Sequence, residues 1–303
     1  MRTAPFRGPL AWQTALMALL LFPSIPASSA QRPSLPAVEL VRRTVHNEIN
    51  PSNDDAKYMF RDRKEMGHSS QTKLVVETHD AMAGILVAIN DKPLSAQQRG
   101  EENARVDRFV KDPDELKKRQ RQEREETEHV ERIMKALPDA FLYEYAGTEP
   151  GGQSMGKTGH LLTRLKFRPN PAYDPPSRVE QVLSGMAGYM LIDTNEDRIA
   201  KIDGTLQTEV SFGWGILGHL DRAGHFLVQQ ADAGDGHWEI SRMDLAFTGK
   251  ILFFKSINIT QTEVMSDFQP VPSNLTFAQG LELLRKHEAL LAENGSHFSA
   301  EAK

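Results

Sequence analysis

Between residues 139 and 267, short runs of alternating apolar and polar residues follow one another with turn-forming residues between them. A period of two residues is typical of strands, and tight turns join antiparallel neighbours. Parallel βαβ units would need crossover helices, whereas the segments between these runs are rich in turn signals. The pattern therefore predicts an antiparallel meander. Its strands are expected at 141–146, 161–168, 185–192, 198–209, 225–231, 238–247 and 250–262.

The segment from 57 to 90 has the same strand period. Tyr58 and Phe60 alternate with polar neighbours, and turn signals at Gly67 and Asp80 divide the segment. Three more strands are expected here, which brings the predicted sheet to about ten strands.

Three other segments have helical periodicity. Apolar residues lie at helical spacing in 36–49 and in 276–291, so that each segment presents one apolar stripe. The third, at about 95–136, is a charged helical insertion. Within it, Ser95 and Gln98 form a capping box, and Asp112 before Pro113 starts a second helix.

The charged segment 117–128 contains no apolar residue. A helix that is polar on every face is solvated or projects from the body of the protein. A partner-binding coil is the alternative, although no heptad seam runs through the segment.

These elements predict an α+β fold: an incomplete antiparallel β-barrel of about ten strands, covered on one side by helices. A single half-barrel domain is expected over residues 31–303. If the helices pack fully on the sheet, the interior is a solid core. If they leave a gap, an apolar pocket remains.

Residues 1–30 have the layout of a cleavable signal peptide. Arg2 and Arg7 precede an apolar run at 15–22, and small residues at 27–30 end in a cleavage site after Ala30. The apolar run is shorter than the roughly 20 residues that span a bilayer, so cleavage is favoured over the alternative, a membrane anchor. The chain has no cysteine, which suits a periplasmic protein held by its core alone. A soluble periplasmic protein is therefore expected.

The charge balance excludes several partner classes. Cleavage would remove two arginines and no acid from a formal net charge of −5, leaving −7. Nucleic acids require a basic surface, and so does standing attachment to anionic lipid. We therefore expect no nucleic-acid partner.

One segment, 151–158, matches the phosphate-loop pattern GxxxxGKT, and Asp193 ends a strand in the manner of a Walker B motif. A phosphate loop must lead into a helix whose free N–H groups face the phosphates. Here Gly159 follows at once, and Leu165 and Phe167 alternate with basic residues at strand period. We therefore interpret the match as a coincidence and expect no bound nucleotide.

Other motif matches are also incomplete. The GxGxxG match at 213–218 lacks the helix of a dinucleotide site and is interpreted as a glycine-rich bend between strands. The segment 193–197 resembles the start of a calcium loop but lacks its glycine and its bidentate glutamate. The ten histidines have no metal-ligand spacing, and no nucleophile elbow occurs. No catalytic residue, metal or cofactor is predicted, and the protein is not expected to be an enzyme.

Several segments together resemble exported bacterial proteins related to the outer-membrane lipoprotein-sorting carriers, the superfamily of the lipoprotein localisation factors and sigma-E regulatory proteins. The likeness is carried by the stretches 58–65, 165–171 with 175–178, 211–218, 252–255 and 266–268. It implies a half-barrel wrapped around an apolar cavity that is closed on one side by helices. Its relatives carry lipids or lipid-modified proteins across the periplasm, or sense envelope stress.

The sequence thus favours a periplasmic protein of outer-membrane biogenesis that carries or senses a lipid or acylated protein ligand. The alternative is an envelope regulatory or scaffolding module that docks a protein partner through its charged helices. Apolar strand positions are candidates to line the pocket, although each could instead be core. These candidates are Phe60, Leu74, Val76, Leu165, Phe167, Tyr189, Leu191, Phe226 and Trp238.

Overall fold

The computed structural model describes residues 35–50, 56–213, 217–234, 236–251 and 255–293. These residues belong to one compact unit of the chain, Leu35–Lys303. The proposed signal peptide lies outside the described residues. Among the helices that are described, none is both long and apolar enough to cross a membrane.

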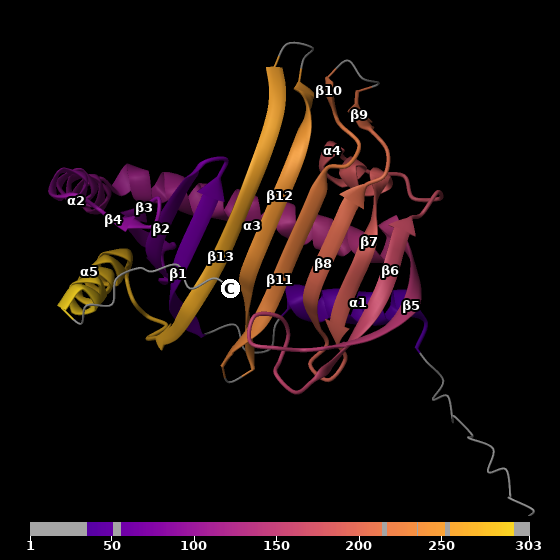
Figure 1. Cartoon of the computed structure of the whole chain (residues 1–303), viewed down its shortest axis with the longest axis horizontal. Helices are drawn as coiled ribbons and strands as arrows, with labels where there is room; N and C mark the ends of the chain where they lie inside the picture. Colours follow the sequence, from indigo (N-terminus) through magenta and orange to yellow (C-terminus); the bar gives the residue numbers. More distant parts are fainter. Residues whose placement is uncertain (1–34, 51–55, 214–216, 235, 252–254, 294–303) are drawn as a thin grey trace, which may run out of the picture. The chain divides into compact units, whose positions relative to one another are not determined.

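The fold is α+β, with one large antiparallel sheet (Figure 1). Thirteen strands are described, in the order β4-β3-β2-β1-β13-β12-β11-β8-β7-β6-β5, with β9 and β10 attached beside β12. The sheet does not close, because β4 and β5 are its two ends in the described chain. The strands are β1 (Lys57–Met66), β2 (Ser69–Val76), β3 (Ala83–Ile89), β4 (Lys92–Pro93), β5 (Phe141–Pro150), β6 (Leu161–Pro169), β7 (Met186–Asp193), β8 (Arg198–Leu206), β9 (Val210–Phe212), β10 (Gly218–Leu220), β11 (His225–Gly234), β12 (His237–Ile251) and β13 (Lys255–Val271).

Five α-helices are described, and α2 and α3 carry the capping residues that the sequence predicted. The helices are α1 (Ala37–Ile49), α2 (Ala96–Lys111), α3 (Pro113–Ala140), α4 (Arg178–Gln181) and α5 (Phe277–Glu293). The capping box of Ser95 and Gln98 is present at α2, and Asp112 caps α3 with Pro113 in its first turn. These features confirm the sequence-based helix starts.

The expected count of about ten strands was too low, because β4, β9 and β10 have only two or three residues each. Strands that short leave no periodicity in the sequence. A second prediction was also wrong: the strand expected at 238–247 does not end before Thr248 and Gly249, since β12 continues through them to Ile251. Gly249 is needed there for close approach, because a Cβ would lie 2.2 Å from the carbonyl oxygen of His219 in β10.

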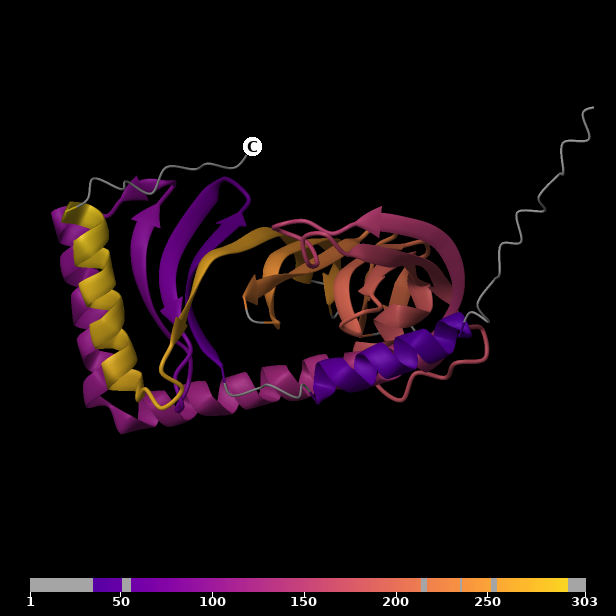
Figure 2. The same cartoon turned by 90° about the horizontal axis from the view of Figure 1, so that it is seen from below.

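The sheet has an inner face, along which α1 and α3 lie, and an opposite outer face (Figure 2). Directly paired residues of antiparallel strands share a face. One row of paired residues therefore marks the inner face across seven strands: Leu165, Met190, Ile202, Val228, Met243, Glu263 and Lys64.

Two large apolar cores lie on different faces of the sheet. The α1 core is on the inner face of β5–β8, where Leu165, Phe167 and Met190 pack against residues of α1 and the C-terminal turns of α3. The α5 core is on the outer face of β1–β3, where Leu74 and Val76 pack against α2 and α5. The expectation of helices on one side of the sheet is therefore only approximate.

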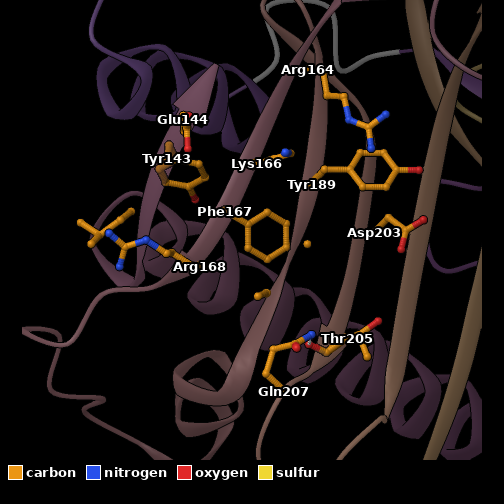
Figure 3. Close-up of a pocket in the computed structure, with 13 residues that line it drawn as sticks. Tyr143, Glu144, Arg164, Lys166, Phe167, Arg168, Tyr189, Asp203, Thr205 and Gln207 are labelled. Carbon is orange, nitrogen blue, oxygen red and sulfur yellow. Dashed lines mark hydrogen bonds between the residues drawn. The ribbon is translucent and has the colours of Figure 1, made fainter. Parts of the chain in front are cut away.

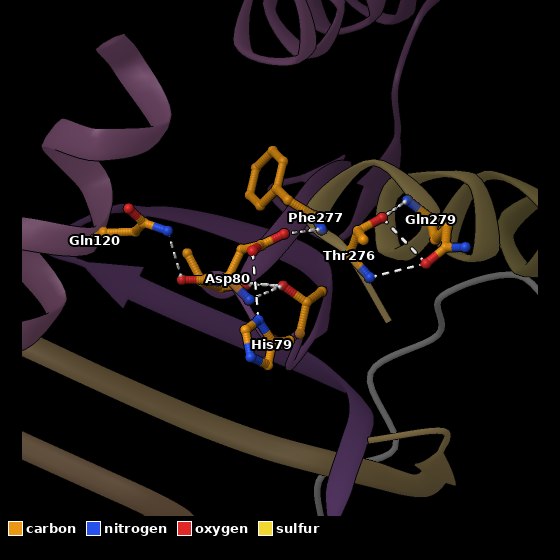
Figure 4. Close-up of polar contacts among 8 residues, drawn as sticks. His79, Asp80, Gln120, Thr276, Phe277 and Gln279 are labelled. Carbon is orange, nitrogen blue, oxygen red and sulfur yellow. Dashed lines mark hydrogen bonds and ion pairs between the residues drawn. The ribbon is translucent and has the colours of Figure 1, made fainter. Parts of the chain in front are cut away.

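The polar helix α3 is anchored to the sheet near its N-terminal half. The Gln120 side chain donates a hydrogen bond to the carbonyl oxygen of Asp80 at 3.2 Å (Figure 4). The Asp80 carboxylate in turn accepts the N–H of Phe277, the first residue of α5, at 2.9 Å. Asp80, in the turn between β2 and β3, thus connects α3 with α5.

The strand β3 would expose unpaired backbone groups, because its neighbour β4 is very short. Two side chains of α2 satisfy these groups. The Glu102 carboxylate accepts the N–H of Leu86 at 2.7 Å, and the Arg105 guanidinium donates to the carbonyl oxygen of Gly84 at 3.1 Å. Covering an edge strand in this way prevents its pairing with another chain.

Candidate functional site

The nine residues predicted to line a pocket are distributed over four clusters and both faces of the sheet. Leu165 and Phe167 are buried in the α1 core, and Phe226 packs against it. Leu74 and Val76 are buried in the α5 core on the outer face. The structure therefore does not bring all nine together.

The other four candidates belong to two smaller clusters. Tyr189, Leu191 and Trp238 pack in a cluster with Leu162 and Ala200. Phe60 packs with Tyr58 and Val75 on the inner face. Of the nine, Phe60 lies at a cavity between the sheet and the helices, which is where the sequence-based hypothesis placed a pocket.

This inner cavity has a volume of about 270 Å³. It lies between β1, β2, β12 and β13 on one side and residues of α2 and α3 on the other. Its apolar lining is Phe60, Val75, Met82, Ile240, Met265 and Phe268, and its charged lining is Asp62, Lys73, Glu77, Arg105, Arg119, Glu239 and Glu263.

A β-bulge positions the aromatic wall of the inner cavity. The register of β1 and β13 shifts between Met59 and Arg61, and Asp267 has a positive φ of 59° opposite this point. Such a bulge re-aims side chains. The ring of Phe268 consequently lies 5.3 Å from the ring of Phe60. Sequence reasoning missed Phe268 as a lining residue because an irregular register leaves no signal in the alternation.

Two carboxyl groups meet at the charged side of the inner cavity. Burial and the neighbouring carboxylate of Glu263 raise the pKa of Asp62 to about 6. The Oδ1 atom of Asp62 is buried and has no hydrogen-bond partner among the described residues. Lys64 forms an ion pair with Glu263 at 3.4 Å, which leaves Asp62 as the less compensated acid.

A row of apolar side chains leads from the inner cavity toward the α1 core. Glu263 of the cavity is paired with Met243, which is followed in neighbouring strands by Val228 and Ile202. These three apolar side chains are half-buried. We call Ile202, Val228 and Met243 the inner apolar row.

The helix α3 crosses the inner face without packing along its whole length. Seven consecutive residues, 124–130, are exposed on every side of the helix. A packed helix would bury one face of each turn. The middle of α3 is therefore a bridge between its packed ends, and the prediction of a solvated charged segment holds for 124–128 but not for the anchored residues Arg119, Gln120 and Glu123.

The GxxxxGKT segment lacks the geometry of a phosphate loop. Strand β6 follows it in place of a helix, as the sequence analysis predicted. The Nζ atom of Lys157 is 2.8 Å from a carboxylate oxygen of Glu196 and 3.7 Å from one of Asp232. Both acids would repel a phosphate at this lysine. That the chain binds no nucleotide remains a prediction.

The two other motif matches lie between strands that follow one another in the chain. The GxGxxG segment joins β9 to β10, which are paired antiparallel, although Trp214, Gly215 and Ile216 lie outside the described residues. The calcium-loop-like segment connects β7 to β8. The Asp193 carboxylate accepts the N–H groups of Asn195 and Glu196, which is the pattern of a polar turn.

A group of possible metal ligands lies beside β10. The ligand atoms of Glu209, His219 and Asp221 lie within 4.8 Å of one another. Carboxylate and imidazole donors suit zinc. Each carboxylate already accepts a hydroxyl hydrogen bond, from Ser211 to Glu209 and from Thr248 to Asp221. The histidine spacing gave no hint of this group because the strand pairing, not the sequence, brings the residues together.

No protein-family model matches this chain, and no curated protein matches it. Among solved structures, it is similar to a DUF1329 family protein from Desulfovibrio piger, determined at 1.75 Å resolution. The two share 11% sequence identity and a TM-score of 0.26, over 82% of this chain and 97% of that chain. At this level of similarity the match does not assign the chain to a family.

Proposed function

We propose that this protein is a non-catalytic periplasmic binding protein that carries or senses a lipid or an acylated protein. The acyl chain would lie on the inner face of the sheet, with one end in the inner cavity and the rest along the inner apolar row. The observation that carries this proposal is the cavity of about 270 Å³ between sheet and helices, walled by Phe60, Met265 and Phe268.

The size of the inner cavity supports a partial enclosure of the ligand. Pockets for whole small molecules start at roughly 300 Å³, slightly above this volume. One end of an acyl chain is therefore a better fit than a complete lipid. Each buried CH₂ group contributes about 0.8 kcal/mol to the free energy of binding. An acyl chain that also covers the half-buried side chains of the inner apolar row would therefore need no charged contact.

Native mass spectrometry tests this proposal. The protein would be expressed with its own N-terminal segment, purified without detergent and incubated with palmitic acid. We expect one bound acyl chain in the wild type, and a mature mass that starts at Gln31. A wild type that stays free of acyl species after incubation with palmitic acid and with phospholipid would contradict the proposal.

Matched variants locate the ligand. The double variant Val228→Gln with Met243→Gln makes the inner apolar row polar, and we expect palmitate binding to weaken at least tenfold. Ala246→Gln is the control, because Ala246 is an exposed residue of the same strand on the outer face. Equal binding by the double variant and the control would place the ligand elsewhere.

A second candidate function is the docking of an envelope protein through the charged helices. The observation that favours it is the exposed bridge 124–130 of α3, whose charged side chains are open to solvent. Substitutions Glu125→Gln and Glu126→Gln distinguish the two functions. If the protein binds an acyl chain on its inner face, both variants should bind palmitate as the wild type does. If it is a docking module, the wild type binds no acyl chain, and the variants lose the protein partner.

A further inference from the structure

The outer face of β5–β8 has a hollow that is separate from the inner cavity (Figure 3). Its volume is about 760 Å³, within the range of small-molecule sites. Helices cover the other face of these strands, where the α1 core lies. Ala187 lines the hollow with a short side chain, opposite Thr205 of β8 and among longer side chains of the neighbouring strands.

Three basic residues at alternate positions of β6 line the outer hollow: Arg164, Lys166 and Arg168. Because the side chains of a strand alternate, all three project from the same face. Arg164 is already occupied: it forms an ion pair with Glu149, and its guanidinium carbon lies 4.0 Å from the centre of the Tyr189 ring.

Of the two acids that line the outer hollow, Glu144 and Asp203, only Asp203 has its charge compensated by ion pairs. Asp203 forms ion pairs with Lys201 at 3.3 Å and with His225 at 3.1 Å. Glu144 is the cross-strand partner of Lys166, but no ion pair within 4.0 Å joins them. Within the described chain, Lys166 and Arg168 have no ion pair and no side-chain hydrogen bond.

We propose that the outer hollow binds a small organic anion, through a phosphate or carboxylate group held by Lys166 and Arg168. The hydroxyl of Thr205 supplies a neutral donor at the hollow, and Leu142, Ala187 and the Tyr189 ring offer apolar surface to the rest of the ligand. Arginine and lysine bind such oxygen groups through charge-assisted hydrogen bonds. This site lies on the face opposite the proposed acyl site and does not depend on it.

Calorimetric titration with phenyl phosphate tests the proposal, with inorganic phosphate and phosphatidylglycerol vesicles as separate arms. We expect phenyl phosphate to bind more tightly than inorganic phosphate, because its ring covers apolar surface. Binding should weaken when salt is raised. Binding to vesicles without binding to phenyl phosphate would overturn the proposal of a small-molecule site.

Variants with matched charge complete the test. Lys166→Gln with Arg168→Gln should weaken phenyl phosphate binding at least tenfold. The control, Arg108→Gln with Lys118→Gln, removes the same charge from exposed positions of α2 and α3 and should change binding less than twofold. Equal weakening in both pairs would show an unspecific charge effect and overturn the site.

A third variant tests the shape of the hollow with its cations retained. Ala187→Leu fills part of the hollow and should also weaken binding at least tenfold, with thermal unfolding used to verify that the variant is folded. Palmitate should not compete with phenyl phosphate in the wild type. Unchanged phenyl phosphate affinity in a folded Ala187→Leu variant would contradict the proposed location.

Discussion

At the β5–β8 end of the sheet, α1 and the last turns of α3 pack on the inner face, whereas at the β1–β3 end α2 and α5 pack on the outer face (Figure 2). The apolar core therefore changes faces along one continuous sheet. The strands between the two ends are covered fully on neither face. This difference explains why uncovered surfaces remain in the middle of the inner face and on the outer face of β5–β8.

The residue types of the middle strands agree with this arrangement. Strand β13 is 17 residues long and its described side chains are all half-buried or exposed. It contains Thr, Ser, Asn and Gln at many positions, although it pairs with a strand on each side. A central strand buried on both faces would be predominantly apolar. Polarity in a central strand thus marks a part of the sheet that helices do not cover.

The largest expected effect concerns the attachment of α1 at the β5–β8 end. Glu48 of α1 forms an ion pair with Arg198 of β8 at 3.1 Å, with side chains only 8% and 15% exposed. Glu48→Gln leaves the arginine charge buried and unpaired, and should cost about 3–5 kcal/mol in denaturant unfolding. Arg42→Gln, which breaks exposed pairs with Glu39 in the same helix and with Asp139 of α3, should cost less than about 1 kcal/mol. Equal costs would contradict a buried attachment.

Parallel truncations compare the two cores directly. Leu165 of the α1 core and Leu284 of the α5 core are both completely buried. Each change to alanine should lower the free energy of unfolding by about 2–5 kcal/mol, through lost burial and a cavity. Leu142→Ala, at a 39% exposed position of β5, should have a much smaller effect. Two separate unfolding transitions in either variant would show that the ends of the sheet are independent.

A smaller effect is expected at the connection of α5 to the β1–β3 end. Asp80→Ala removes the acceptor for the Phe277 N–H and a negative charge at the start of α5. The loss should be about 1 kcal/mol, with faster hydrogen exchange in the first turn of α5. Lys286→Ala, which breaks an exposed pair with Glu282 within the same helix, serves as the control. Unchanged exchange in Asp80→Ala would remove this residue from the connection.

An effect of similar size is a pH dependence at the β1–β3 end, where β1 carries Asp62. The pKa of Asp62 is raised from 3.8 to about 6, so between these values the folded protein keeps a proton that the unfolded chain has released. The free energy of unfolding that the protonated Asp62 side chain contributes is therefore fully present below pH 4, and it is lost as the pH rises through 6. Asp62→Asn should remove this loss and gain on the order of 1 kcal/mol at pH 7, after allowance for partial exposure.

Unfolding of wild type and Asp62→Asn at pH 4 and pH 7 measures this difference. Lys73→Gln gives a second check, because the charge of Lys73 lowers the pKa of Asp62. Its loss should increase the pH dependence. A pH profile identical in all three proteins would contradict a raised pKa of Asp62.

Much of the secondary structure could be predicted from the sequence. The alternation in 57–90 and 139–267 and the caps at Ser95 and Asp112 gave most element boundaries within a few residues. Local pattern and capping are properties of neighbouring residues, so they can be recognised without a fold. The absence of a helix after the GxxxxGKT segment was predicted for the same reason.

The candidate sites depended on tertiary structure. The inner cavity combines β1, β2, β12 and β13 with α2 and α3, and its ring Phe268 is turned toward Phe60 by a bulge. The nine apolar candidates were chosen by alternation alone, which separates two faces but does not identify the face a helix covers.

By itself, the sequence determined an antiparallel α+β protein with a polar helix, because period, caps and turn residues act over a few positions. Only the tertiary structure decided that α2 and α5 cover one face and α1 and α3 the other. That choice depends on how α3 crosses the sheet, since residues 124–130 bridge the two packed ends. Surfaces left uncovered by this crossing, including the inner apolar row and the outer hollow, are set by contacts between residues far apart in the chain.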